Sequence, residues 1–185
     1  MSHAIDFDAL DEKLFLLQQI VLASERYCEE RKVGGESDVG DAEHDVYWGW
    51  VKTIVSNYLL ECAIKTRVFQ DYLVESRFNH DFAKIDEESR KGIDLGEVRK
   101  GNFDMTVRET CNKIIHATRV VLVWSEKKFE GETIKYWKGS FELNGTKGGE
   151  SWQLELHVGN WAKAMTRYHD LLSQTEERIY AGQDW

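Results

Sequence analysis

The sequence predicts an α+β protein, mostly α, in which an antiparallel helical bundle is followed by a small antiparallel sheet and a closing helix. Apolar residues recur at helical spacing through most of residues 8–118. Between residues 119 and 158 the spacing changes to alternation, which is typical of half-buried strands. The chain contains no proline, which suits long uninterrupted helices. We therefore expect residues 1–118 to form the bundle and residues 119–185 a three-stranded sheet with a C-terminal helix, packed on the same domain.

Two long helices are predicted first. The first is expected over residues 8–32, with Asp6 or Asp8 capping its first turn and Gly34-Gly35 ending it. The second is expected over residues 41–78, where the apolar residues form a wide face. An apolar face this wide predicts neighbours on more than one side. Because about 38 residues exceed the usual helix length, a kink or break is also compatible with the pattern.

Shorter elements follow. Residues 79–101 are polar, and we expect a short helix over 82–90 and an irregular connection after it. Another helix should begin near residues 102–106 and end near 118. Thr106 followed by Glu109 predicts a capping box at its start.

The C-terminal third is predicted to hold three strands and a helix. The strands are expected at 119–124, 134–143 and 151–158, with the turn between the last two at 144–149. Asn160 can cap a last helix that runs to about residue 180.

Composition limits the classes of function. The net charge of −9 argues against broad adhesion to nucleic acid or to anionic membranes. Within residues 103–138, however, seven Lys or Arg stand against five Asp or Glu, so a nucleic-acid contact, if there is one, is expected to be local and around this segment. No apolar run approaches the length that spans a bilayer, and the N-terminus lacks the basic-then-apolar order of a signal peptide. We therefore expect a cytoplasmic protein with no membrane partner.

Cysteine usage predicts packing rather than chemistry. Cys28, Cys62 and Cys111 are isolated, and none forms a C-x-x-C pair. Each lies in an apolar-periodic stretch, so we expect buried side chains. The sequence also lacks H-E-x-x-H, a phosphate-binding glycine loop and a nucleophile elbow. We accordingly predict no metal and no cofactor. His157 and His169 are expected at the surface.

The segment DMTVRETCNKIIHATR, residues 104–119, carries the main candidate site. On a helix, Arg108, Asn112 and His116 fall at i, i+4 and i+8, so a cation, an amide and an imidazole share one stripe. Such a stripe could bind a phosphate. It could equally be a solvated helix face, or Asn112 and His116 could form buried hydrogen bonds that fix helix packing.

These residues resemble the HEPN family of all-α nucleotide-binding domains, many of which are metal-independent RNases. Asn112 and His116 match the N-x-x-x-H part of its R-N-x-x-x-H signature, and Cys111 stands where the family has Arg. The nearest preceding arginine, Arg108, is eight residues before the histidine. The resemblance covers about residues 8–118 and rests mostly on helix order.

The resemblance implies a homodimer in which two such helices meet across a scissile phosphate. His116 would then act as general base, and Arg108 or Arg119 would stabilise charge on phosphorus. Asn112 would orient the histidine or the phosphate, and Glu61 would supply an acidic side chain from a neighbouring helix. Glu61 could instead form a surface pair with Lys65, four residues on.

Two hypotheses about function follow. The first is a HEPN-like nucleotide- or RNA-binding module, which could be a metal-independent endoribonuclease of a toxin or defence system. Arg108 and His116 should then be accessible and close together in a cleft. The second is a non-enzymatic interaction or homodimerisation module, in which these residues should be dispersed, or buried with satisfied hydrogen bonds. Sheet aromatics such as Trp124, Tyr136, Trp137 and Trp152 could present a stacking surface. Their alternation is also that of a core packed against the last helix.

Overall fold

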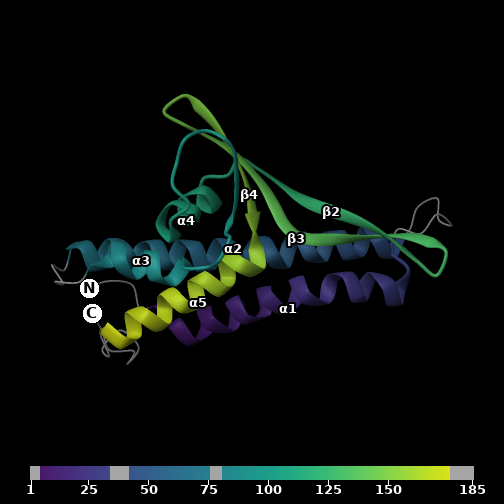
Figure 1. Ribbon diagram of the computed structural model, residues 1–185, viewed down its shortest axis with the longest axis horizontal. Helices are drawn as coiled ribbons and strands as arrows, with labels where there is room; N and C mark the ends of the chain where they lie inside the picture. Colours follow the sequence, from purple (N-terminus) through teal and green to yellow (C-terminus); the bar gives the residue numbers. More distant parts are fainter. Residues whose placement is uncertain (1–4, 34–41, 76–80, 176–185) are drawn as a thin grey trace.

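The computed structural model describes residues 5–33, 42–75 and 81–175, and Figure 1 shows their arrangement. These residues form five helices and one four-stranded antiparallel sheet, which confirms an α+β fold that is mostly α. None of the helices within these ranges is long and apolar enough to cross a bilayer.

The first two helices form a long antiparallel pair. They are α1 (Phe7–Arg31) and α2 (Ala42–Glu75). The Asp6 carboxylate accepts a hydrogen bond from the Ala9 amide at 2.9 Å, as expected of an N-cap. Helix α1 ends before the two glycines, because Lys32 takes the left-handed conformation and its amide bonds back to the last turn. Gly34 and Gly35 lie outside the described residues.

Helix α3 (Phe82–Arg90) lies where it was predicted, but the connection after it contains a strand. Strand β1 (Gly96–Lys100) pairs antiparallel with the last strand of the sheet, with Gly96 opposite Leu156. The sheet therefore has four strands in the order β1-β4-β3-β2, and the expectation of three was wrong. Five residues with little alternation give a weak local signal, so this strand depends on its partner.

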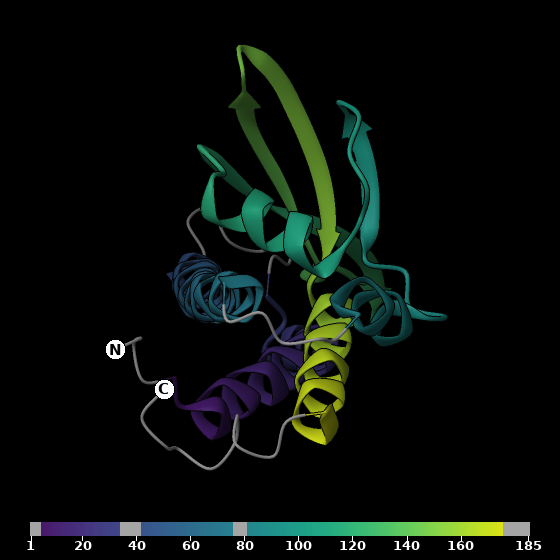
Figure 2. The same ribbon diagram turned by 90° about the vertical axis from the view of Figure 1, so that its left-hand side faces the viewer.

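Helix α4 (Val107–Ile115) follows the predicted cap: the Thr106 hydroxyl accepts from the Glu109 amide at 3.0 Å. It ends earlier than the expected residue 118, and His116 is its C-cap residue. Figure 2 shows α4 between α2 and the strands.

Two of the other strands are longer than their apolar alternation predicted, and the last has the predicted length but begins and ends one residue earlier. They are β2 (Arg119–Phe129), β3 (Glu132–Lys147) and β4 (Glu150–His157). Glu130-Gly131 and Gly148-Gly149 connect them, and all four residues have positive φ, as tight two-residue hairpin turns require. The predicted turn at 144–149 is thus confined to its last residues.

Helix α5 (Val158–Thr175) follows β4 directly. Asn160 does not cap it, because its side chain donates to the Asp94 carbonyl at 2.7 Å instead. The predicted end of this helix at residue 180 lies outside the described residues. Helix α5 packs on α1 and α3, so it closes the helical layer.

One hydrophobic core joins the helices and the sheet. Trp137 of β3 and Trp161 of α5 are almost fully buried, and Trp152 of β4 is 4% exposed. The core interpretation therefore holds for Trp137 and Trp152, while Trp124 and Tyr136 are half-buried. All three cysteines are buried and free. Burial raises the pKa of the Cys28 thiol to about 11 and that of Cys62 to about 12.

Candidate functional site

Helix α4 carries the predicted stripe, and its N-terminal half is tied to α2. The guanidinium of Arg108 donates to the Asp71 carboxylate at 2.7 Å, and Arg67 donates to the same carboxylate at 3.1 Å. Partial burial raises the pKa of Asp71, but hydrogen bonds from the two arginines outweigh it and hold the pKa below its ordinary value. Arg108 is accessible and is already paired.

Asn112 acts as a bridge between these helices. Its side-chain oxygen accepts from Arg67 Nε at 2.8 Å, and its side-chain nitrogen donates to Glu109 at 3.1 Å. Both ends of the amide are therefore used within the protein. For this residue, the structure matches the interpretation in which the stripe fixes helix packing.

His116 is placed differently. It is exposed, and its imidazole has no hydrogen-bond or ion-pair partner among the described residues. It borders a hollow of about 350 Å³ between α4 and the β3–β4 hairpin. We call this the α4 hollow, and its lining residues are Glu109, Asn112, Lys113, His116, Thr146, Lys147 and Trp152.

Two lysines border the α4 hollow. Lys113 is only 3% exposed, and its ammonium lies 3.2 Å from Glu109 and 4.0 Å from the centre of the Phe103 ring. A cation over an aromatic face is attracted by the ring's quadrupole. Lys147 has a 76% exposed side chain and lies 3.7 Å from the same carboxylate. One lysine is therefore built into the wall, and the other is largely exposed and can reach a ligand from its ion pair with Glu109.

Glu109 organises this wall. Burial raises the pKa of its carboxyl, but hydrogen bonds from Asn112 and Lys113 lower that pKa by more. The net pKa therefore lies below the ordinary value. Glu109 is therefore ionised at neutral pH. A single carboxylate thus positions an amide and two ammonium groups around the hollow.

Trp152 forms the floor of the hollow. A Cβ atom at Gly145 would lie 2.3 Å from the Trp152 ring and 3.0 Å from the His116 carbonyl oxygen, so only glycine fits between them. The Lys113 ammonium lies 4.5 Å from the centre of the same ring. Trp152 is buried and supports the site without offering a stacking face.

The other predicted site residues lie apart from this hollow. Glu61 pairs with Lys65 at 2.7 Å and with Lys13 of α1 at 3.4 Å, which is the surface-pair interpretation. Arg119 is exposed at the start of β2, opposite Asn144, and is not part of the described lining. The acidic side chain that a neighbouring helix brings to α4 is Asp71.

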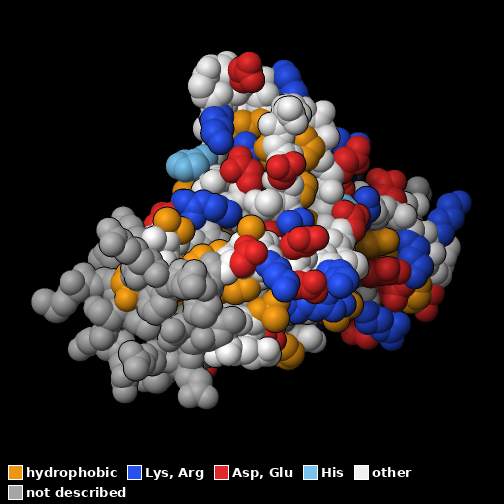
Figure 3. All heavy atoms as spheres, turned by 60° about the vertical axis from the view of Figure 1, so that its left-hand side comes forward, with side chains coloured by type: hydrophobic (Ala, Val, Ile, Leu, Met, Phe, Trp, Pro, Cys, Tyr) orange, Lys and Arg blue, Asp and Glu red, His pale blue; other side chains and the backbone are white. Residues whose placement is uncertain are grey.

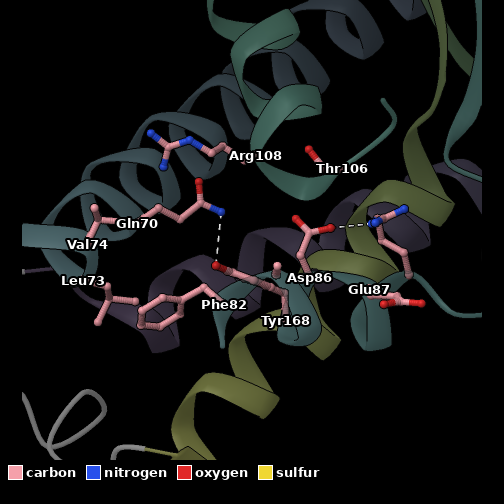
Figure 4. A pocket seen from close by; sticks show the side chains of 11 residues that line it. Gln70, Leu73, Val74, Phe82, Asp86, Glu87, Thr106, Arg108 and Tyr168 are labelled. Carbon is pink, nitrogen blue, oxygen red and sulfur yellow. Dashed lines mark hydrogen bonds and ion pairs between the residues drawn. The ribbon is translucent and has the colours of Figure 1, made fainter. Parts of the chain in front are cut away.

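Arg108 borders a different cavity from His116. That cavity measures about 660 Å³ and lies between α2, α3, α4 and α5 (Figure 4). We call it the interhelical pocket, and its lining residues are Gln70, Leu73, Val74, Phe82, Ala83, Asp86, Glu87, Arg90, Thr106, Arg108 and Tyr168. Arg108 and His116 therefore do not share a cleft within the chain, contrary to what the RNase hypothesis expected. The three residues of the predicted stripe have three different environments: an ion pair at this pocket, a helix bridge and an open imidazole.

The spacing of residues in the sequence did not predict that lysines and a tryptophan floor border the α4 hollow. Lys147 and Trp152 come from the β3–β4 hairpin, more than 30 residues after α4. The Gly148-Gly149 turn was the available signal, because a tight hairpin brings its two strands to one place. Which helix that hairpin would meet could not be predicted from local spacing.

The surface assignment of His169 was wrong. Its ring is fully buried on α5, where Nδ1 lies 2.9 Å from Asp11 and Nε2 lies 3.2 Å from the Thr66 hydroxyl. His157 is partly exposed, with Nδ1 3.4 Å from Asp94. Within the described part of the chain, no group of three or more His, Cys, Asp or Glu is arranged to hold a metal.

Comparison with known proteins adds no relative: no family model, curated protein or solved structure matches this chain. Function must therefore be argued from the geometry of these two cavities.

Proposed function

We propose that the protein is a HEPN-like nucleotide- or RNA-binding module that contacts phosphate through the α4 hollow. The observation that carries this proposal is the exposed imidazole of His116, which borders the same hollow as Lys113 and Lys147. Ammonium groups bind phosphate as point charges, and an imidazole can donate to it or accept a proton near neutral pH.

Charge supports a local contact over a broad one. Two lysines and one glutamate border the hollow, so its wall is net positive in a protein of net charge −9. Acidic and basic side chains are interspersed over the face seen in Figure 3, without a large field of one sign. Binding should therefore involve few phosphates and decline as salt is added.

The enzymatic form of this proposal is a metal-independent endoribonuclease. His116 would take the proton of a ribose 2′-hydroxyl, and the 2′-oxygen would attack phosphorus. The 5′-oxygen would leave and take a proton from solvent, which yields a 2′,3′-cyclic phosphate and a 5′-hydroxyl. Because Arg108 borders the interhelical pocket and not the α4 hollow, Lys147 is the side chain we assign to stabilising charge on phosphorus.

The test separates binding from cleavage. A fluorescent single-stranded RNA is incubated in EDTA with wild type, His116→Ala and the control His157→Ala, and both cleavage and anisotropy are measured. If the α4 hollow binds RNA, His116→Ala and Lys147→Ala should each weaken the affinity for RNA about tenfold, the effect of losing one charged hydrogen bond. If the protein also cleaves RNA, His116→Ala should abolish formation of the product.

The matched control for Lys147→Ala is Lys128→Ala, another exposed lysine of the sheet. RNA affinity that both lysine variants lower equally would reject the α4 hollow as the site. Binding without cleavage in EDTA would reject the endoribonuclease and leave the binding module. No affinity for RNA or nucleotides at low salt would reject both.

A second candidate, a homodimerisation module, rests on the outer face of α2. This face carries exposed apolar side chains at helical spacing, with Trp50 62% and Val46 56% exposed. The others are Leu60, Ile64 and Val68. They extend over roughly 33 Å of helix. Helices α1 and α4 pack on other faces of α2, and an uncovered stripe of this length is typical of an interface.

Light scattering tests this candidate. Trp50→Lys with Ile64→Lys should convert a dimer to a monomer, while the control Phe15→Lys changes an exposed apolar residue of α1 and should leave the mass unchanged. A wild-type protein that stays monomeric at high concentration would exclude homodimerisation.

A further inference from the structure

The interhelical pocket has the size and lining of a small-molecule site. Its volume of about 660 Å³ falls within the range of about 300–1,000 Å³ typical of ligand pockets. Figure 4 shows Leu73, Val74 and Phe82 toward one end and Asp86 and Glu87 toward the other, with Tyr168 and Gln70 between them. The pocket is therefore apolar at one end and charged at the other, where Arg90 pairs with Asp86 and leaves Glu87 as the remaining carboxylate.

Its middle is rich in hydrogen-bond donors. The Tyr168 hydroxyl accepts from the Gln70 side-chain nitrogen at 3.2 Å, and both side chains are buried. Burial raises the pKa of Tyr168 to about 12, so the hydroxyl keeps its proton at neutral pH. That proton has no acceptor among the described residues, and Gln70 uses one of its two N–H groups for Tyr168. A buried donor without an acceptor favours a ligand that supplies one.

Arg108 adds a positive charge beside these donors. It shares the Asp71 carboxylate with Arg67, so two guanidinium groups face one carboxylate. Arg108 uses only its Nη2 in that pair, which leaves its other N–H groups for a ligand. This part of the lining is therefore suited to an anion.

The carboxylates at the opposite end restrict the ligand. Both oxygens of Asp86 are used: one accepts from Arg90 and the other accepts from the Val107 amide at 2.8 Å. Glu87 is exposed at the rim. A second negative charge on a ligand would be repelled at this end, so a monoanion fits better than a dianion.

We propose that the interhelical pocket binds a small amphipathic monocarboxylate. The carboxylate accepts hydrogen bonds from Arg108, Tyr168 and Gln70, and the apolar body packs on Leu73 and Phe82. This site shares no lining residue with the α4 hollow and is independent of RNA binding.

Calorimetry with decanoate as the probe tests the proposal, with decylammonium and 1-decanol as probes of equal chain length. Decanoate should bind at one site per chain, and 1-decanol and decylammonium should each bind more weakly. Arg108→Gln should weaken decanoate binding about tenfold, because it removes a charged hydrogen bond. Its control is Arg119→Gln, an exposed arginine outside the pocket, which should leave the affinity unchanged.

Two further variants test the pocket in case Arg108→Gln does not fold. Ala83→Trp fills the pocket from an exposed position, and Val74→Glu puts a carboxylate at its apolar end. Each should abolish decanoate binding while circular dichroism stays as in wild type. His116→Ala should bind decanoate normally, which separates this proposal from RNA binding. Equal affinity for decanoate and decylammonium, or full affinity in a folded Ala83→Trp or Val74→Glu, would overturn the proposal.

Discussion

His116 and His169 are the same residue type in opposite environments. His169 lies inside the helical layer, where it hydrogen-bonds Asp11 of α1 and Thr66 of α2, and its ring meets Phe7 edge to face at 5.3 Å. His116 ends α4, is exposed, and borders the α4 hollow without a partner among the described residues. A histidine whose two nitrogens are both bonded within the protein stabilises the fold. One whose ring is open can bind a ligand.

The largest effect is expected from His169→Ala. The variant removes two hydrogen bonds, leaves Thr66 buried without this partner and opens a cavity, so the free energy of unfolding should fall by about 3 kcal/mol. Urea unfolding followed by circular dichroism measures this loss. The control is His157→Ala, a partly exposed histidine, which should cost less than about 1 kcal/mol. Similar losses in both variants would remove the structural role given to His169.

Gly145→Ala should have the next largest effect. It should lower the free energy of unfolding and also change the shape of the α4 hollow. The added methyl would lie 2.3 Å from Trp152, so the floor must shift, at a cost of about 2 kcal/mol. RNA affinity should also fall although His116 is intact. Gly49→Ala is the control, because a Cβ there meets nothing within 4 Å. Unchanged stability in Gly145→Ala would show that the Trp152 floor is not rigid.

Acid should weaken the wall of the α4 hollow. The pKa of Glu109 is lower in the folded protein than in the unfolded chain, so its contribution is present above the unfolded value near 4.3 and is lost as pH falls through the folded pKa. Glu109→Gln should therefore cost about 1 kcal/mol at pH 7, a figure kept small because the carboxylate is partly exposed.

Urea unfolding of wild type and Glu109→Gln at pH 7 and pH 3 measures this difference. The two proteins should differ less at pH 3, because the contribution of the ionised carboxylate declines once the pH is below the unfolded-state value. Glu126→Gln is the control, since Glu126 is exposed on β2 and outside the hollow. A gap between the two proteins that widens in acid would contradict the direction of the shift.

The smallest effect on stability is expected from His116→Ala. Nothing among the described residues bonds its ring, so the free energy of unfolding should change by less than about 0.5 kcal/mol. Thermal unfolding measured beside His169→Ala gives the direct contrast. A loss comparable to that of His169→Ala would mean that His116 is structural too, and the α4 hollow would lose its main candidate for ligand binding.

Local signals predicted several elements accurately. The short helix at 82–90 has its own cap in Asp81, and the Thr106–Glu109 pair marks the start of α4 within a few residues of chain. Strand β1 was missed because its five residues become a strand only by pairing with β4, more than 50 residues later. His169 lies even farther along the chain from its partners, 103 residues from Thr66 and 158 from Asp11, and no periodicity of α5 indicates them.

The candidate site was predictable only in part. Spacing placed Arg108, Asn112 and His116 on one segment, but it could not assign them different partners. Asp71 and Arg67, which occupy Arg108 and Asn112, come from α2, and Lys147 comes from a hairpin. The HEPN-like resemblance and the RNA-binding function remain proposals, since no comparison bears on them.

The sequence by itself determined the fold class, the helix caps at Asp6 and Thr106, the burial of the cysteines and the position of the segment that carries His116. These properties follow from apolar spacing and from hydrogen bonds between residues a few positions apart. Both can be identified within a short stretch of sequence. The tertiary structure alone decided that the α4 hollow lies beside the C-terminal end of α4, that His169 is buried, and that a pocket forms between four helices. Those outcomes depend on which distant surfaces pack together, and packing is a property of the whole chain.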